Sequence, residues 1–356
     1  MSDFLNNMSD EIKSLRQDIE NEANVPSGYI PIELSSKGKW GAPKLFHIKN
    51  FTVEQISSLS FCEPDQVPIK ILKMIPEIVW EKDVDFGQFH EGEVIETLII
   101  LYRTFYQSIL ANQDWKLTDE DKEFLKKEHG GESLEYKKQI QAYENGDWKP
   151  KFDIDLNRVR FYECDDDVKN TVQVKKANGF TCEFTYPKYG DTLVLHEIIT
   201  RKFQEKENQL ASIKEKIQFR NNMEEKWKNG EMVDLSRCPV VSEEERRKYE
   251  EFQIEKGTFL TKLTRTILLK SINGKDISKL PLEEKVMYAD DPNLDFSTIN
   301  KVTKIFKDLK VGPVEKIIGF DPIIREVREV EYSFRIFDFI LALQSEGNTE
   351  DDIVLV

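Results

Sequence analysis

The chain has four histidines, the side chains best suited to proton transfer and metal binding near neutral pH. They are widely separated in the sequence, at His47, His90, His129 and His196. His196 and Glu197 begin like the helix of a zinc protease, in which a second histidine follows the first by four positions. Thr200 stands there instead. One histidine and one glutamate cannot hold zinc alone, so His196 is expected to be an ordinary surface or core residue.

Other motifs of catalysis and ligand binding are incomplete. Ser36-Lys37-Gly38-Lys39 and Gly274-Lys275-Asp276 lack the upstream glycine and the metal-binding hydroxyl of a phosphate-binding loop. The run Asp165-Asp166-Asp167 points consecutive side chains in different directions, which favours a solvated turn over a set of cation ligands. The patterns G-x-G-x-x-G and G-x-S-x-G do not occur. The sequence therefore predicts a protein that is not an enzyme, with no catalytic, cofactor-binding or metal-ligating residues.

The cysteines also argue against a fold held together by disulfide bonds or by a bound metal ion. Cys62, Cys164, Cys182 and Cys238 are far apart and form no C-x-x-C pair. Four cysteines are too few for a disulfide framework in a chain of this size, and their spacing does not suit a Cys₄ zinc site. We expect inert thiols in a reducing compartment, with Cys182 on the apolar face of a strand.

Composition excludes several classes of partner. Among 356 residues, 51 Lys and Arg against 66 Asp and Glu give a net charge of −15, which repels nucleic acid. No run approaches the roughly 18 apolar residues of a membrane span. The acidic start Met1-Ser2-Asp3-Phe4 is unlike a signal peptide. A hydrophobic content of 39% is enough to form the hydrophobic core of a folded domain. We therefore expect an intracellular chain with neither nucleic acid nor membrane as its partner.

The order of elements predicts an α+β fold in six segments. Residues 1–25 are expected to hold an N-terminal helix, and 26–150 to form a mainly helical domain. That domain begins with a turn-rich loop at 26–43 and a short strand at 44–49. Its helices are expected at Thr52–Leu59, Val67–Trp80, His90–Ala111 and from Thr118 to Gly130. The helix from His90 is apolar on most sides, which predicts a central position in the domain.

The remaining segments alternate between strands and helices. Residues 151–191 are expected to be β-rich, with strands at Arg158–Cys164, Thr171–Lys176 and Phe180–Tyr186. Ala177-Asn178-Gly179 predicts a hairpin between the last two. Residues 192–275 are expected to form a long helical arm, with one helix to about Asn229 and a second from Ser242 to about Lys270. Segment 276–344 should hold two further helices and a strand or hairpin within Ile323–Ile340, and 345–356 an acidic tail.

Several short motifs, taken in order, resemble the baseplate hub proteins of contractile-tailed bacteriophages. These are the Ser35-Ser36-Lys37-Gly38 loop, "FTVEQISSLS" at Phe51–Ser60, "FHEGEVIETLIILYRTFY" at Phe89–Tyr106, "FDIDL" at Phe152–Leu156, "YPKYGD" at Tyr186–Asp191 and the closing segment Ile317–Phe339. The cysteine pair that some members carry is missing here, so the resemblance implies no metal or cofactor.

The resemblance implies a non-enzymatic structural subunit of a phage tail baseplate, located in the virion after assembly in the host cytoplasm. Its partners would be other baseplate or tail proteins in a hetero-oligomeric assembly. One alternative is a hub-assembly chaperone of the same family that is absent from the mature virion. A third possibility, from another class, is a carboxylate-based hydrolase with His90 or His196 in a cleft beside two carboxylates. A hub subunit should expose apolar patches, which we expect near residues 26–43 and 340–356.

Overall fold

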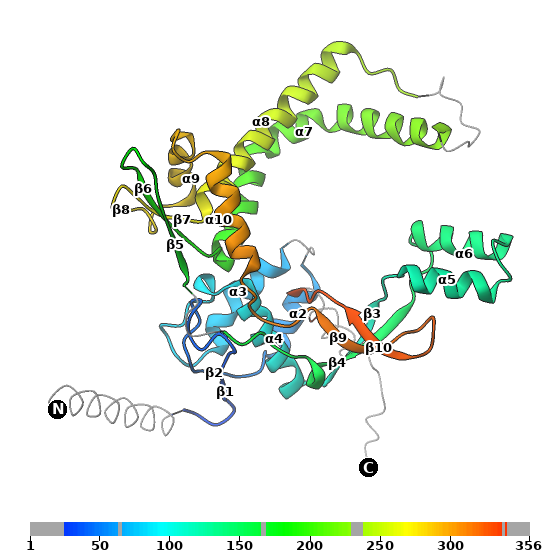
Figure 1. Cartoon of the computed structure of the whole chain (residues 1–356), viewed down its shortest axis with the longest axis horizontal. Helices are drawn as coiled ribbons and strands as arrows, with labels where there is room; N and C mark the ends of the chain where they lie inside the picture. The colour runs from blue at the N-terminus through cyan, green and yellow to red at the C-terminus, as the bar shows by residue number, and fades with distance from the viewer. Residues whose placement is uncertain (1–24, 63–65, 165–168, 229–237, 337–338, 340–356) are drawn as a thin grey trace. The chain divides into compact units, whose positions relative to one another are not determined.

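The computed structural model describes residues 25–62, 66–164, 169–228, 238–336 and 339, and it has the predicted α+β fold (Figure 1). All strand pairs in the described part are antiparallel. The chain forms two compact units: unit 1 is Met1–Val168 with Lys310–Val356, and unit 2 is Lys169–Leu309. The expected helix in 1–25 and tail in 345–356 lie outside the described residues, apart from residue 25.

The core of unit 1 surrounds helix α4 (Glu91–Phe105), which is buried along most of its length, as its apolar sequence predicted. Strands β1 (Ile30–Ile32) and β2 (Phe46–Ile48) pair beside it. Helices α2 (Val53–Ser60) and α3 (Val67–Ile78) follow, and Thr52 caps α2 through the predicted capping box. The aromatic rings of Phe46, Phe86 and Phe89 pack on one another within this core.

The segment 26–43 is part of this core, so the exposed apolar patch predicted there is wrong. The side chains of Ile32, Leu34, Trp40 and Ala42 are at most 2% exposed. Turns of the glycine- and proline-rich chain bring these four side chains inward, which composition alone does not reveal. The patch predicted at 340–356 lies outside the described residues.

The helix predicted over His90–Ala111 is too long by six residues at its end. Helix α4 ends at Phe105, and Ile109–Asp114 forms strand β3, which pairs with β4 (Lys151–Asp155). An apolar run does not distinguish helix from strand, and here pairing with β4 decides it. The two-stranded β3–β4 ribbon carries helices α5 (Asp119–Glu128) and α6 (Leu134–Glu144) at its end (Figure 1).

The C-terminal hairpin of unit 1 lies earlier in the sequence than predicted. Strands β9 (Lys316–Phe320) and β10 (Val327–Glu331) form it, whereas the alternation of Tyr332, Phe334 and Ile336 lies beyond the strands. Those side chains alternate because they pack against other aromatic rings, as Tyr332 does on Phe152 and Phe334. The strand predicted at Arg158–Cys164 is also wrong: after the short helix η2 (Leu156–Arg158), only Phe161 makes a bridge, to Pro313.

Unit 2 contains a four-stranded sheet in the order β5-β6-β7-β8. The predicted hairpin is confirmed as β5 (Thr171–Lys175) and β6 (Thr181–Thr185). Strands β7 (Leu269–Ile272) and β8 (Lys275–Asp276) continue the sheet, joined by Asn273-Gly274. The second arm helix, predicted to reach Lys270, therefore ends at Ile267 because the chain enters β7. The segments expected at 151–191 and 192–275 do not match the units, since β5 and β6 belong with the helices that follow.

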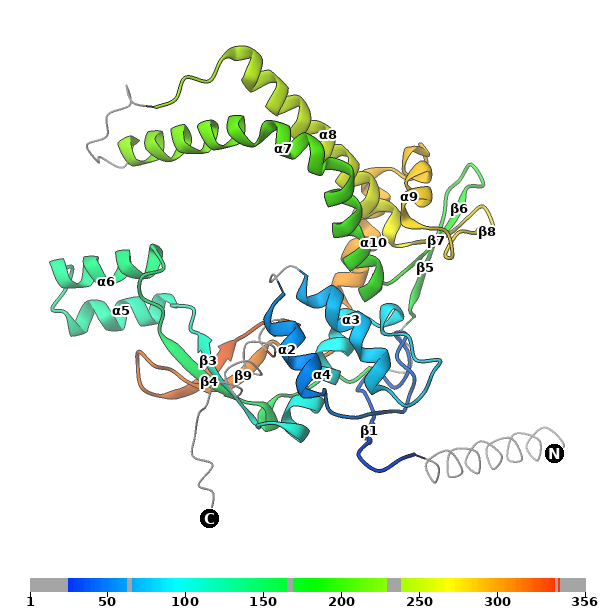
Figure 2. The ribbon, with the colours of Figure 1, turned by 180° about the vertical axis from the view of Figure 1, so that it is seen from behind.

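The helical arm of unit 2 is present as predicted. Helices α7 (Tyr189–Lys228) and α8 (Glu243–Ile267) lie side by side over part of their length (Figures 1 and 2). At about 1.5 Å per residue, α7 is about 60 Å long. Helices α9 (Leu282–Lys285), η4 (Val286–Asp290) and α10 (Phe296–Asp308) complete the unit. No helix of the described residues is long and apolar enough to cross a membrane.

Candidate functional site

The histidines do not converge on one site. His47 contacts Glu81 at 2.7 Å, and His129 contacts Gln139 at 2.7 Å. His90 caps α4, and the side chain of His196 lies outside the described residues, as does the Asp165–Asp167 run. Within the described part of the chain, no three His, Cys, Asp or Glu side chains are placed to hold a metal ion.

The thiols differ in accessibility. Cys164 and Cys182 are buried, and Cys182 is 3% exposed on the inner face of β6, as predicted. Burial raises the pKa of the Cys182 thiol to about 11. Cys62 and Cys238 are partly exposed.

We therefore expect Ellman's reagent to label Cys62 and Cys238 in the folded chain, because only an accessible thiolate reacts quickly. Cys164 and Cys182 should react only after denaturation. Absorbance during titration measures this directly, with the urea-unfolded chain as the control. Rapid labelling of Cys182 under native conditions would contradict the placement of β6.

The Ser35–Ser36 loop is fixed onto α4 by two buried carboxylates. Glu93 and Glu96 are 0% and 2% exposed, and they lie one turn apart. Ser36 Oγ donates to Glu93 Oε1 at 2.5 Å, and Ser35 donates to Glu96 through its N–H at 2.9 Å and its hydroxyl at 2.7 Å. The Ser35–Ser36 part of the loop is thus joined to α4, and these hydrogen bonds fix the position of the loop on the helix.

Burial raises the pKa of both carboxyl groups of this junction. For Glu93, hydrogen bonds from Ser36, His90 and Ala42 oppose the effect of burial. For Glu96, hydrogen bonds from Ser35 oppose burial, while the neighbouring Glu93 adds to it. The hydrogen bonds that each carboxylate accepts satisfy its buried oxygens and hold the loop on α4.

A small cleft of about 240 Å³ opens at the start of α4. Its lining includes His90, Glu91, Glu315 and Tyr332. Nδ1 of His90 accepts the N–H of Gly92 at 3.0 Å, and burial lowers the pKa of His90 to about 4. Burial also raises the pKa of Glu91. The imidazole is therefore neutral at pH 7, and its Nδ1 is committed to the helix terminus.

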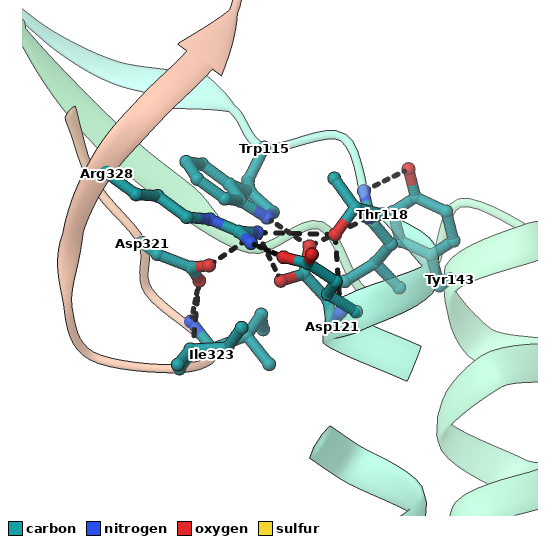
Figure 3. Close-up of polar contacts among 10 residues, drawn as sticks. Trp115, Thr118, Asp121, Tyr143, Asp321, Ile323 and Arg328 are labelled. Carbon is teal, nitrogen blue, oxygen red and sulfur yellow. Dashed lines mark hydrogen bonds and ion pairs between the residues drawn. The ribbon is translucent and has the colours of Figure 1, made fainter. Parts of the chain in front are cut away.

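Among the described residues of unit 1, several charged side chains meet where α5 lies against the β9–β10 hairpin (Figure 3). Asp121 and Asp321 are both 0% exposed, and both contact Nη2 of Arg328, at 2.5 and 2.6 Å. The guanidinium also lies 5.4 Å from the ring centre of Trp115 and 2.9 Å from Glu120. We call Asp121, Asp321 and Arg328 the Asp–Arg–Asp cluster.

Backbone and indole groups hold the two carboxylates of the cluster in place. Asp121 Oδ2 accepts Trp115 Nε1–H at 2.9 Å and the Thr118 N–H at 2.8 Å. Asp321 Oδ1 accepts the N–H groups of Ile323 at 2.7 Å and Ile324 at 3.1 Å. The Thr118–Asp121 capping box is visible in the sequence, but Arg328 lies 207 residues from Asp121 and no local pattern links them.

The described residues also present long helical surfaces with little burial. Helix α6 has no buried residue, and α5 buries only Asp121 and Leu125. Beyond Phe203, no described side chain of α7 is buried, and Phe219 and Trp227 are 47% and 58% exposed. These hairpins are candidate interaction surfaces, which fits the expectation of an arm better than that of a compact core.

Ion pairs and aromatic contacts fix how the arm helices pair. Lys206 contacts Glu255 at 2.7 Å and Lys216 contacts Glu245 at 2.9 Å, and Lys256 pairs with Glu207. Phe203 packs between Phe252 and Phe259 at the base. Lys206 contacts a later residue of α8 than Lys216 does, so the two helices are antiparallel.

Comparison with known proteins adds nothing to this geometry: no protein-family model, curated protein or solved structure gives a significant match to the chain.

Proposed function

We propose that the chain is a non-enzymatic structural subunit of a phage contractile-tail baseplate hub that acts through protein–protein interfaces. The proposal rests on the observation that the α5–α6 hairpin and the outer part of α7 have few buried side chains. An isolated helix is marginal in water, and most helical stability in proteins comes from packing an apolar face. Helices with almost no buried side chains, such as α6 and the outer part of α7, gain that packing when a neighbouring subunit covers them.

Charge constrains the neighbours. Unit 2 holds 26 Lys and Arg against 23 Asp and Glu, which gives it a net charge of +3. The whole chain has a net charge of −15, so the net charge of unit 1 is −18. A surface this acidic repels other acidic surfaces over a distance of about 10 Å at ordinary ionic strength. The subunits that contact unit 1 should therefore be neutral or basic at the contact.

Quantitative mass spectrometry of gradient-purified phage particles tests the proposal. A hub subunit should occur at a small fixed copy number, of the order of three to six per particle, set by baseplate symmetry. Abundance in the lysate with none in particles would overturn the structural role and support the assembly chaperone. Absence from every phage particle and phage-infected lysate would overturn the baseplate assignment itself.

Replacing Phe219 and Trp227 by glutamine should leave folding almost unchanged and reduce incorporation into particles at least about tenfold. Both side chains are exposed on α7, so each exchange should alter the free energy of unfolding by no more than about 0.5 kcal/mol. Copy number in particles, measured beside a urea unfolding curve, gives both quantities. Met287→Gln is the control, because Met287 is 74% exposed in unit 2 but lies off the arm. Equal incorporation of all variants would exclude the outer part of α7 as an interface.

One observation favours the hydrolase as a second candidate: His90, Glu91 and Glu315 line a common cleft. A hydrolase would need a base there, but a histidine with a pKa of about 4 accepts protons weakly at pH 7. The cleft of about 240 Å³ is also below the range of roughly 300–1,000 Å³ typical of small-molecule sites. Hydrolysis of p-nitrophenyl acetate or phosphate that is lost in Glu315→Gln would support this candidate over the hub.

A further inference from the structure

Strand β5 forms one edge of the four-stranded sheet of unit 2, and among the described residues no strand pairs with its outer side. The N–H of Lys176 donates to the carbonyl of Phe180 at 2.9 Å, which fixes the alternation of hydrogen-bonded and non-bonded pairs along β5 and β6. The backbone groups of Val172 and Val174 therefore point toward β6. The residues whose backbone groups point away from the sheet are Thr171, Gln173 and Lys175.

An open edge of this kind can pair with a further strand. In the part of the chain that the structure describes, the outward N–H and C=O groups of β5 make no backbone hydrogen bond. The apolar layer of the sheet also ends at this edge. Cys182 and Phe184 on β6 are 3% and 0% exposed, whereas Val174 and Val172 beside them on β5 are only partly buried. A further strand would satisfy the backbone of β5 and cover its valines.

The sequence of β5 is suited to pairing with a second copy of itself. Two antiparallel β5 strands use all of their outward residues in one register, in which Gln173 of each copy faces Gln173 of the other. In that register Val172 lies opposite Val174 of the second copy, which joins the apolar layers of the two sheets. Thr171 lies opposite Lys175 of the second copy, so no two like charges are directly opposed across the contact.

Charge distinguishes β5 from β10, the strand at the edge of the hairpin in unit 1. The N–H of Tyr332 donates to the carbonyl of Glu315 at 2.7 Å, which fixes the alternation along that hairpin. The outward residues of β10 are therefore Val327, Glu329 and Glu331. Two β10 strands paired in the same way would place Glu329 directly opposite itself, which is destabilising. Unit 1 also has a net charge of −18 against +3 for unit 2, so two copies repel each other least through unit 2.

We propose that two copies of the chain associate through β5, in antiparallel orientation about a twofold axis at Gln173, so that their sheets join into one continuous sheet. The contact is a single short strand on each side, so the dimer is weak, with a dissociation constant of the order of 10 μM. The pairing closes the open edge and covers the valines of β5. The proposal concerns the chain alone and does not depend on the baseplate assignment.

Sedimentation equilibrium of the full chain tests the proposal, and the wild type should show a reversible equilibrium between monomer and dimer. Gln173 is exposed and lies on the axis, so Gln173→Lys and Gln173→Glu each place two like charges face to face. Each exchange should raise the dissociation constant at least about tenfold. An equimolar mixture of the two variants places a lysine opposite a glutamate and should restore the dimer. Gln253→Lys and Gln253→Glu are the matched controls, because Gln253 is an exposed glutamine of α8, and both should dimerise like the wild type.

Gln173→Cys gives a second measurement that requires no loss of affinity. Facing residues of an antiparallel pair have Cα atoms about 5.5 Å apart, within the range of a disulfide, so oxidation should cross-link this variant into dimers. Gln253→Cys should not cross-link beyond the wild type. A wild type that stays monomeric at about 100 μM would overturn the proposal. So would a dimer that survives both charge exchanges at Gln173, or folded charge variants that do not associate when mixed.

Discussion

Replacing Gly312 by alanine should destabilise unit 1 by about 2–4 kcal/mol, since it combines backbone strain with a collision. Gly312 has a φ of +85°, in the left-handed region that side chains with a Cβ rarely adopt. A Cβ there would lie 2.4 Å from the carbonyl oxygen of Gly92. That oxygen belongs to the backbone of α4, the central helix, which cannot yield without moving the core. Urea unfolding of the full chain, followed in unit 1 by hydrogen exchange, measures the loss.

Two further glycines separate the contributions. Gly130 has a φ of +73°, and no atom lies within 4 Å of the position that a Cβ would take, so Gly130→Ala should cost only about 1 kcal/mol of strain. At Gly92 the φ is ordinary for a helix but a Cβ would lie 2.2 Å from the carbonyl oxygen of Val311. Gly92→Ala should therefore show the collision, offset by up to about 1 kcal/mol of helix propensity. If Gly312→Ala costs no more than Gly130→Ala, α4 and the 311–312 segment do not touch.

Local patterns in the sequence predicted the elements whose ends are determined locally. The Thr52 and Ser242 capping boxes begin α2 and α8 where predicted, because the hydrogen bonds of a capping box involve only residues three apart. Asn178-Gly179 predicted the β5–β6 hairpin for the same reason, since positive φ at glycine suits a tight turn. The α+β class follows from such local signals.

Predictions failed where a distant segment decides the structure. Ile109–Asp114 is a strand because β4, about forty residues later, pairs with it, and β7 is a strand because β6 lies beside it. The apolar side chains Ile32, Leu34, Trp40 and Ala42 of loop 26–43 are buried, and hydrogen bonds to Glu93 and Glu96 hold the loop on α4. The Asp–Arg–Asp cluster could not be predicted either, because its members are ordinary charged residues until folding brings them together.

Replacing Arg328 by methionine should be the most damaging single loss of a charged side chain in unit 1, at about 3–5 kcal/mol. Its side chain is 21% exposed and is the cation in contact with Asp121 and Asp321, both fully buried. Removing it leaves their charge without a counter-ion in the interior. Lys316→Met is the control on the same hairpin: Lys316 is 57% exposed, lies 3.6 Å from Glu329, and should cost no more than about 1 kcal/mol.

The pH dependence of Arg328→Met distinguishes charge from packing. The pKa of Asp321 is already raised by burial, whereas that of Asp121 is lowered. Without the guanidinium, burial is opposed by fewer favourable contacts, so the pKa of Asp321 should rise further and that of Asp121 should rise above 3.8. Groups with raised folded pKa values stabilise the chain below 3.8 and lose that contribution as pH rises. The penalty for Arg328→Met, measured by urea unfolding against the wild type, should therefore be smaller near pH 4 than near pH 8. An equal penalty at both would mean that Arg328 acts mainly by stacking on Trp115, since that contact carries no dependence on carboxyl protonation.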